Sequence, residues 1–268
     1  MKHPIPAACL LALLASAPAA QICGGLTVSV TPNPAPFGST VTATYTNNTA
    51  GPITLPVPCV FRCIHQGVGT GGPVVYSVGC ATVLHTLMPG DQLSQLWDQE
   101  DDTGQQVLPG PYTLDLVTPG PISCTAGLNV LPCTQGSLVQ FGQGCGMGSC
   151  PFFSFGTPVL YAKSCPVIGQ TLELSVSEAD CGSAVLLLLG TSNTSAGGMP
   201  LPFPLGGGCN LLVSPDLSVP GTIDSLGRAS FPLAIPPNPG LVGGILHTQI
   251  LTPGPPLKMS NGLTITIG

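Results

Sequence analysis

The chain has 268 residues, of which 43% are hydrophobic and only 6% are charged. Disordered chains show the opposite balance, and 36 glycines and 31 prolines argue against long helices because both residues break them. The formal net charge of −6 argues against a nucleic-acid partner and gives no basic attraction to anionic lipid. We therefore expect a turn-rich globular protein.

Residues 1–19 have the pattern of a signal peptide. Lys2 and His3 form a short n-region, residues 7–14 are apolar, and small residues before Ala20 supply a cleavage site. The apolar run is too short to span a bilayer, and no second run of that length follows. We expect cleavage near Ala19 and a mature protein that is secreted or held in the periplasm or cell envelope, with no membrane span.

Twelve cysteines fit an exported protein. Cys9 would leave with the signal peptide, so the mature chain keeps an odd number, and at least one cysteine is free or intermolecular. No Cys-x-x-Cys spacing occurs, which favours disulfides over a metal site.

The first strands alternate in hydropathy. Residues 26–30, 40–46 and 53–55 are rich in β-branched and apolar residues and are separated by proline and asparagine breaks. Residues 59–64 and 73–80 then flank a glycine-rich loop, GVGTGG, which predicts a hairpin.

The hairpin predicts one disulfide. Symmetric pairing places Cys59 opposite Cys80, where Cβ atoms lie about 4.5–5.5 Å apart, close to bonding reach. Cys59 and Cys63 cannot bond each other, because four residues of strand span roughly 13 Å. Cys124 and Cys133 flank a short Gly-Leu-Asn loop and predict a second bridge, which leaves Cys23 and Cys63 as a third pair by elimination.

The stretch from Leu87 to Leu116 predicts a strand, an acidic loop, a short strand, a turn and a final strand. It contains the single tryptophan, Trp97, which we expect in the core although a carbohydrate platform is an alternative. Asp98, Glu100 and Asp102 alternate as in a calcium loop, but Thr103 and Pro109 stand where an EF-hand needs glycine and glutamate. The competing interpretation is a solvated loop that keeps a sheet edge soluble.

The glycine-rich run after Thr134 predicts a domain boundary near Gln135. Residues 184–189 are continuously apolar and predict a strand that is buried on both faces. Other strands are expected at residues 211–213, 229–234, 244–251 and 263–267. Short strands with regular turn signals indicate β-sandwiches, and one elongated barrel is the alternative.

A set of motif residues runs through the first half: Thr44-Tyr-Thr-Asn47, Leu87-Met-Pro89-Gly90-Asp91, Trp97-Asp-Gln99, Gly104, Val107, Pro109-Gly110 and Tyr112. Over roughly residues 26–117 this pattern resembles the BsuPI-type intracellular proteinase inhibitor domain, an Ig-like sandwich. The chain departs from that family in export and in the presence of cysteines. The resemblance implies binding to a proteinase but assigns no residue to inhibition.

The second half, from about residue 141, contains the segments CPVIGQTLELSV and SNGLTITIG. With these segments it is similar to an uncharacterised C-terminal module of exported proteins of planctomycetes and related bacteria. Cys145, Cys165 and Cys209 occupy the module's usual positions, whereas Cys150 and Cys181 are additional. The resemblance implies no activity. We therefore expect an all-β protein of two disulfide-stapled Ig-like sandwiches, residues 20–134 and 135–268, after the signal peptide.

Catalytic signatures are absent from the sequence. His65, His85 and His247 lie on expected strands, and there is neither a Gly-x-Ser-x-Gly elbow nor a His-Glu-x-x-His motif. The glycines at 142, 144, 146 and 148 do not match a nucleotide-binding spacing. We expect no enzyme and no cofactor.

Two functions remain. One is a binding module that recognises another protein, which the BsuPI resemblance implies is a proteinase. The other is a structural protein of the cell envelope with no small ligand, in which the odd cysteine links chains.

Overall fold

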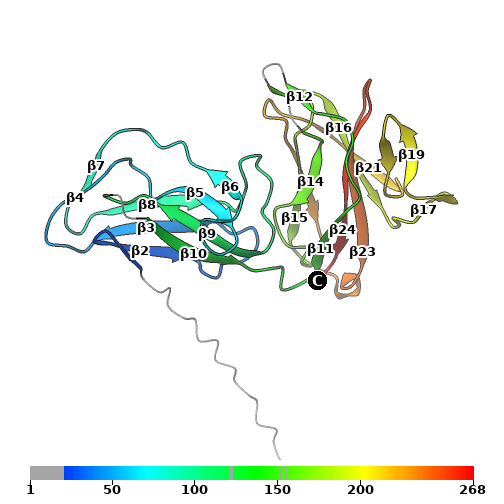
Figure 1. Cartoon of the computed structure of the whole chain (residues 1–268). Helices are drawn as coiled ribbons and strands as arrows, with labels where there is room; N and C mark the ends of the chain where they lie inside the picture. The colour runs from blue at the N-terminus through cyan, green and yellow to red at the C-terminus, as the bar shows by residue number, and fades with distance from the viewer. Residues whose placement is uncertain (1–20, 121–122, 151–152, 155) are drawn as a thin grey trace, which may run out of the picture.

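The computed structural model describes residues 21–120, 123–150, 153–154 and 156–268, so the predicted signal peptide lies outside it. These residues form strands and one short 3-10 helix, η1 (Pro239–Leu241), which confirms the predicted all-β class. None of the helical segments described is long and apolar enough to cross a membrane. Two β-sandwiches lie side by side, each with strands running in its own direction (Figure 1).

The first sandwich packs two four-stranded antiparallel sheets. One has the order β1-β2-β3-β8 and the other β10-β9-β5-β6, while β4 and β7 form a separate ribbon. The strands are β1 (Gln21–Cys23), β2 (Leu26–Thr31), β3 (Val41–Asn47), β4 (Ile53–Leu55), β5 (Phe61–Gln66), β6 (Val74–Ser77), β7 (His85–Leu87), β8 (Gln92–Trp97), β9 (Gly110–Leu116) and β10 (Cys124–Val130).

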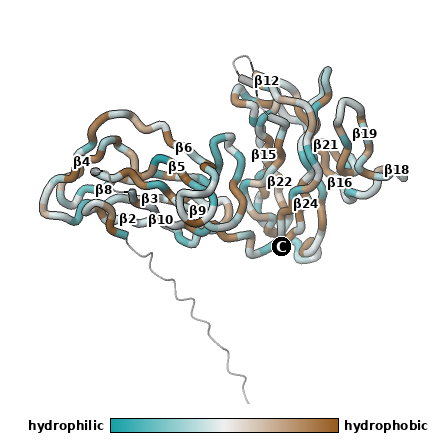
Figure 2. Tube along the Cα trace, in the orientation of Figure 1, coloured by the Kyte–Doolittle hydropathy of each residue, from teal (hydrophilic) through white to brown (hydrophobic). Residues whose placement is uncertain are grey.

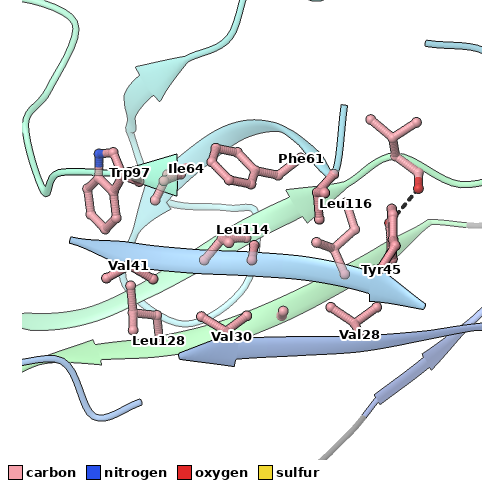
Figure 3. Close-up of a cluster of buried hydrophobic side chains, with 14 of the residues drawn as sticks. Val28, Val30, Val41, Tyr45, Phe61, Ile64, Trp97, Leu114, Leu116 and Leu128 are labelled. Carbon is pink, nitrogen blue, oxygen red and sulfur yellow. Dashed lines mark hydrogen bonds between the residues drawn. The ribbon is translucent and has the colours of Figure 1, made fainter. Parts of the chain in front are cut away.

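The core of this sandwich follows from alternation along its strands. In β3 every second residue is buried, and hydrophobic and paler segments alternate along the strands (Figure 2). Trp97 is 2% exposed and stacks edge-on to Tyr112, with ring centroids 5.6 Å apart, so the core prediction for the tryptophan is confirmed. Figure 3 shows Trp97 at one end of the core and Tyr45, which donates a hydrogen bond to the Val117 carbonyl, at the other.

The second sandwich combines a five-stranded sheet, β11-β24-β23-β16-β21, with a three-stranded sheet, β14-β15-β22. Short hairpins β12-β13, β17-β18 and β19-β20 extend from it. The strands are β11 (Ser137–Phe141), β12 (Ser149–Cys150), β13 (Phe153–Ser154), β14 (Val159–Ala162), β15 (Thr171–Ser177), β16 (Ala184–Gly190), β17 (Ser195–Ala196), β18 (Met199–Pro200), β19 (Phe203–Gly206), β20 (Cys209–Leu211), β21 (Leu217–Thr222), β22 (Ala229–Ala234), β23 (Ile245–Thr252) and β24 (Lys258–Thr266).

The second core is mainly aliphatic. Strand β16 buries Val185, Leu187, Leu188 and Leu189, as its continuous apolar run predicts for a central strand. The first core cluster draws on residues 23–130, and the largest cluster of the second sandwich on residues 138–267. The chain between them belongs to neither cluster.

Five disulfides staple the described chain. Cys59 pairs with Cys80, as the hairpin predicts. The predicted Cys124–Cys133 bridge is wrong, because residues 124–130 form strand β10 rather than a loop, and this strand alone spans roughly 20 Å. Cys124 pairs instead with Cys23, so the predicted Cys23–Cys63 pair is wrong as well.

The remaining bridges are Cys133–Cys165, Cys145–Cys209 and Cys150–Cys181. The first joins the segment after β10 to the connection between β14 and β15 in the second sandwich. The third joins the two cysteines that the resemblance marks as additional. Cys63 is the free cysteine of the described chain, which accounts for the odd number.

Candidate functional site: two loops of the first sandwich

The acidic loop, residues 98–106, leaves the core at Trp97. The Trp97 Nε1–H donates to the Glu100 carbonyl at 2.7 Å. Gln99 turns inward with φ 61°, is fully buried, donates to the Pro36 carbonyl and accepts from the Gly38 N–H. The inward Gln99 directs its acidic neighbours away from the core. The short strand expected after the loop is reduced to one bridge between Glu100 and Gln106.

The three calcium candidates do not converge. Glu100 pairs with Lys163 at 2.5 Å. Asp102 Oδ1 accepts from the Ser77 N–H at 2.7 Å, and Asp98 Oδ1 accepts from the Glu100 N–H at 3.4 Å. Within the described residues, no group of three or more His, Cys, Asp or Glu side chains is placed to hold a metal ion. Asp98 and Asp102 are exposed, whereas Glu100 and Asp101 are half-buried, so the loop is partly solvated.

The acidic loop instead contacts the second sandwich (Figure 1). Lys163 follows β14 and forms the ion pair with Glu100, and Arg228 donates to the Thr103 carbonyl at 3.0 Å. The Tyr161 hydroxyl donates to the Gly104 carbonyl at 2.5 Å. Burial, with a further contribution from Glu100, raises the pKa of Tyr161, so this hydroxyl remains a donor at neutral pH. The loop is therefore the first sandwich's half of an interdomain junction.

A cavity of about 350 Å³ lies beside this junction. Its walls come from both sandwiches and from the connecting segment, and every lining residue is uncharged. Such walls suit an uncharged group, and Gln106, Ser137 and Gln140 add polar atoms to a mainly apolar lining. Its lining includes Phe37, Val107, Pro132, Leu138, Tyr161 and Leu263.

The β6–β7 segment, residues 78–84, is the apolar counterpart of the acidic loop. It arches over the first sandwich away from the junction (Figure 1). Val83 is 57% exposed and Leu84 is 77% exposed, and Met88, just beyond β7, is 53% exposed. In the described chain, residues 81–84 have no backbone hydrogen bond outside the strand ladders.

Both ends of this segment are fixed. The Cys59–Cys80 disulfide holds one end, and the Val78 N–H donates to the Arg62 carbonyl at 2.8 Å. Strand β7 holds the other end by pairing with β4, where the Thr54 and Thr86 hydroxyls lie 3.0 Å apart. The segment thus presents apolar side chains on a backbone anchored at both ends.

The histidines are separated in the structure. His247 is buried, its Nδ1 lies 3.0 Å from the Thr264 hydroxyl, and burial lowers its pKa. His85 lies on β7 and is half-buried. His65 lies beside the free Cys63, with Nε2 and Sγ 3.3 Å apart. Sequence analysis missed this pair, although the Cys-x-His spacing on one strand, which places both side chains on one face, could have indicated it.

No protein-family model matches the sequence, and no curated protein matches it. Among solved structures, the chain overlaps red sea bream transglutaminase with a TM-score of 0.27 at 11% identity, over 91% of this chain and 31% of that one. It overlaps a tandem-repeat region of a large adhesion protein with a TM-score of 0.26 at 14% identity, over 89% and 48%. The human OSCAR ligand-binding domain gives 0.21 at 12% identity, over 90% and 97%. The chain therefore spans about a third of the transglutaminase and about half of the adhesion repeat, and the site assignments depend on its own geometry.

Proposed function

We propose that this is an exported, non-enzymatic binding module whose first sandwich binds another protein through the β6–β7 segment. The observation that carries the proposal is the exposure of Val83, Leu84 and Met88 on a backbone held at both ends. An anchored segment loses little conformational entropy on binding, and its apolar side chains gain free energy from leaving water. Five disulfides fit an oxidising compartment outside the cytoplasm.

A secreted proteinase is the partner that we propose. The resemblance to the BsuPI-type inhibitor domain motivates this choice, and an exposed, anchored loop is a form that a proteinase cleft accepts. Residues 81–84 contain no lysine or arginine, and Leu84 is their most exposed large apolar side chain. A primary pocket of the apolar, chymotrypsin-like kind suits Leu84, whereas the acidic pocket of a trypsin-like enzyme does not.

The test is a titration of the mature, oxidised protein against chymotrypsin-like and trypsin-like proteinases, with residual activity as the readout. We expect stoichiometric inhibition of the first class only. Leu84→Lys should lose at least tenfold in affinity for the chymotrypsin-like enzyme and gain inhibition of the trypsin-like one. Leu226→Lys, at a site 61% exposed in the second sandwich, is the matched control and should change neither.

Absence of inhibition by the wild-type protein at micromolar excess would remove the proteinase as partner. Inhibition that Leu84→Lys leaves unchanged would move the contact to another surface.

The second candidate function is a structural protein of the cell envelope. The unpaired Cys63 favours it, because a free thiol in an oxidising compartment can link two chains. Non-reducing electrophoresis tests it: a dimer that Cys63→Ser abolishes would favour the structural protein, and a monomer throughout would oppose it.

A further inference from the structure

Cys63 and His65 lie on the outward face of the first sandwich. Their neighbour Ile64 points inward and is fully buried, so residues on either side of it share the opposite face. The β5–β9 register places Cys63 opposite Asp115 and His65 opposite Thr113. A thiol, an imidazole and a carboxylate therefore meet on this face.

The glycine-rich loop, residues 67–72, fixes the imidazole. Thr113 clamps the loop, since its hydroxyl donates to the Gly67 carbonyl at 2.9 Å and accepts from the Gly69 N–H at 2.8 Å. His65 Nδ1 lies 3.0 Å from the Gly72 carbonyl oxygen. A Cβ at Gly72 would lie 1.8 Å from the Gln66 carbonyl oxygen, so this close return of the chain requires glycine.

This contact decides the tautomer of His65. A carbonyl oxygen only accepts, so the proton of the neutral ring lies on Nδ1 and the lone pair on Nε2. That lone pair faces Cys63 Sγ at 3.3 Å, and His65 is only 9% exposed. Cys63 is thus placed as the nucleophile, His65 as the base, and the Gly72 carbonyl as the group that orients the base. This arrangement activates nucleophilic side chains.

The surrounding charges keep the resting thiol protonated. Burial raises the pKa of Cys63, Asp115 at 3.9 Å and Asp102 raise it further, and Arg62 opposes them. A thiol of this kind reacts slowly alone at neutral pH, because the thiolate is the nucleophile. A base that takes the thiol proton during attack makes prior ionisation of Cys63 unnecessary.

We propose that Cys63 and His65 form a thiol–imidazole site that exchanges with low-molecular-weight disulfides and leaves the chain carrying a mixed disulfide. The Cys63 proton passes to His65 Nε2 as Sγ attacks one sulfur of the disulfide R–S–S–R′. A new bond joins Sγ to the R sulfur, the old S–S bond breaks, and the R′ thiolate leaves and takes the proton from the imidazolium. The reaction involves no net oxidation, because one disulfide replaces another. A small disulfide is the substrate class because Cys63 is half-buried beside a closed loop.

The test follows the rate at which the mature protein reacts with hydroxyethyl disulfide, read as a mass increase on the intact chain. Cys63→Ser should abolish the adduct. His65→Gln should slow the reaction at least tenfold at pH 7, since a general base contributes about 10²-fold or more, and should approach the wild-type rate at strongly alkaline pH, where the thiol ionises without help. His85→Gln, a histidine of the same sandwich away from the thiol, is the matched control and should react as the wild type does.

The pH profile separates catalysis by His65 from a structural role. With His65 as base, the wild type reacts faster than His65→Gln at neutral pH, and the difference narrows as rising pH ionises the thiol itself. Equal rates for wild type and His65→Gln at pH 7 in folded protein would overturn the proposal. A cyclic peptide disulfide should react at least tenfold more slowly than hydroxyethyl disulfide, and equal rates would overturn the assignment to small disulfides.

Discussion

The acidic loop and the β6–β7 segment belong to the same sandwich and differ in every property that bears on function. The acidic loop holds Asp98, Glu100, Asp101 and Asp102, and it contacts the second sandwich through the Glu100 side chain and the Thr103 and Gly104 carbonyls. Asp98 and Asp102 stay exposed. The β6–β7 segment is uncharged, and nothing in the described chain covers Val83 or Leu84. The charged acidic loop is thus part of the interdomain junction, whereas the uncharged β6–β7 segment exposes apolar side chains to solvent.

The charged residues of the two sandwiches are distributed in a way that fits this junction. The first sandwich carries six of the eleven acidic residues and one basic residue, Arg62, whereas the second carries five acidic residues and three basic ones. Two of those three basic residues contact the acidic loop. Electrostatic complementarity of this kind sets orientation more than affinity, so we expect it to fix how the sandwiches meet.

The largest effect on stability should come from Trp97, the buried residue at the start of the acidic loop. Trp97→Ala removes a buried ring that also donates to the Glu100 carbonyl, and we expect a loss of about 3–5 kcal/mol in the free energy of unfolding. Chemical denaturation followed by circular dichroism measures it. Trp97→Phe keeps most of the volume and should cost clearly less. A loss below about 1 kcal/mol for Trp97→Ala would contradict this packing.

Gly104 and Gly90 form a matched pair that isolates the effect of the interdomain contact on stability. Gly104 has φ +82°, and a Cβ there would lie 2.2 Å from the Arg228 guanidinium carbon, while Gly90 has φ +87° and open space around it. Gly90→Ala should cost about 1–2 kcal/mol from the backbone alone. Gly104→Ala should cost about 1 kcal/mol more, because the guanidinium must move and its hydrogen bond to Thr103 is lost. Trp97 fluorescence during denaturation reports both, and equal costs would show that the Arg228 contact does not form.

The ion pair should have a smaller effect. Glu100→Gln removes the partner of Lys163; the Glu100 side chain is 14% exposed and that of Lys163 is 30% exposed. We expect a loss of about 1 kcal/mol or less in the free energy of unfolding. The loss should shrink at high salt, because partly exposed pairs are screened. Asp98→Asn, which removes a carboxylate with no basic partner among the described residues, should have no such salt-dependent cost.

The smallest effect should appear at the uncovered segment. Leu84→Lys should change the free energy of unfolding by no more than about 0.5 kcal/mol, because an exposed side chain loses little on replacement. Unchanged thermal unfolding alongside altered inhibition would separate binding from folding. A large destabilisation would show that Leu84 is covered in the native protein.

Several features could be predicted from local pattern. Alternation located β2, β3 and β22, and the continuous apolar run located β16, because a strand repeats every two residues and a central strand is buried on both faces. The hairpin around GVGTGG gave the Cys59–Cys80 bridge because its partners are close in sequence. Strands β10 and β11 were missed, since cysteine and glycine interrupt the pattern of β10 and adjacent apolar residues followed by glutamine interrupt that of β11.

The sequence by itself determined the all-β class, the buried tryptophan, the local disulfide and the presence of one unpaired cysteine. Only the tertiary structure decided that Cys124 meets Cys23, that Cys133 joins the sandwiches through Cys165, and that Glu100 pairs with Lys163. It also decided that His65 directs its lone pair at Cys63, through a carbonyl supplied by a loop. The physical reason is range: side-chain period and turn chemistry act over a few residues, whereas these contacts depend on how whole sheets pack.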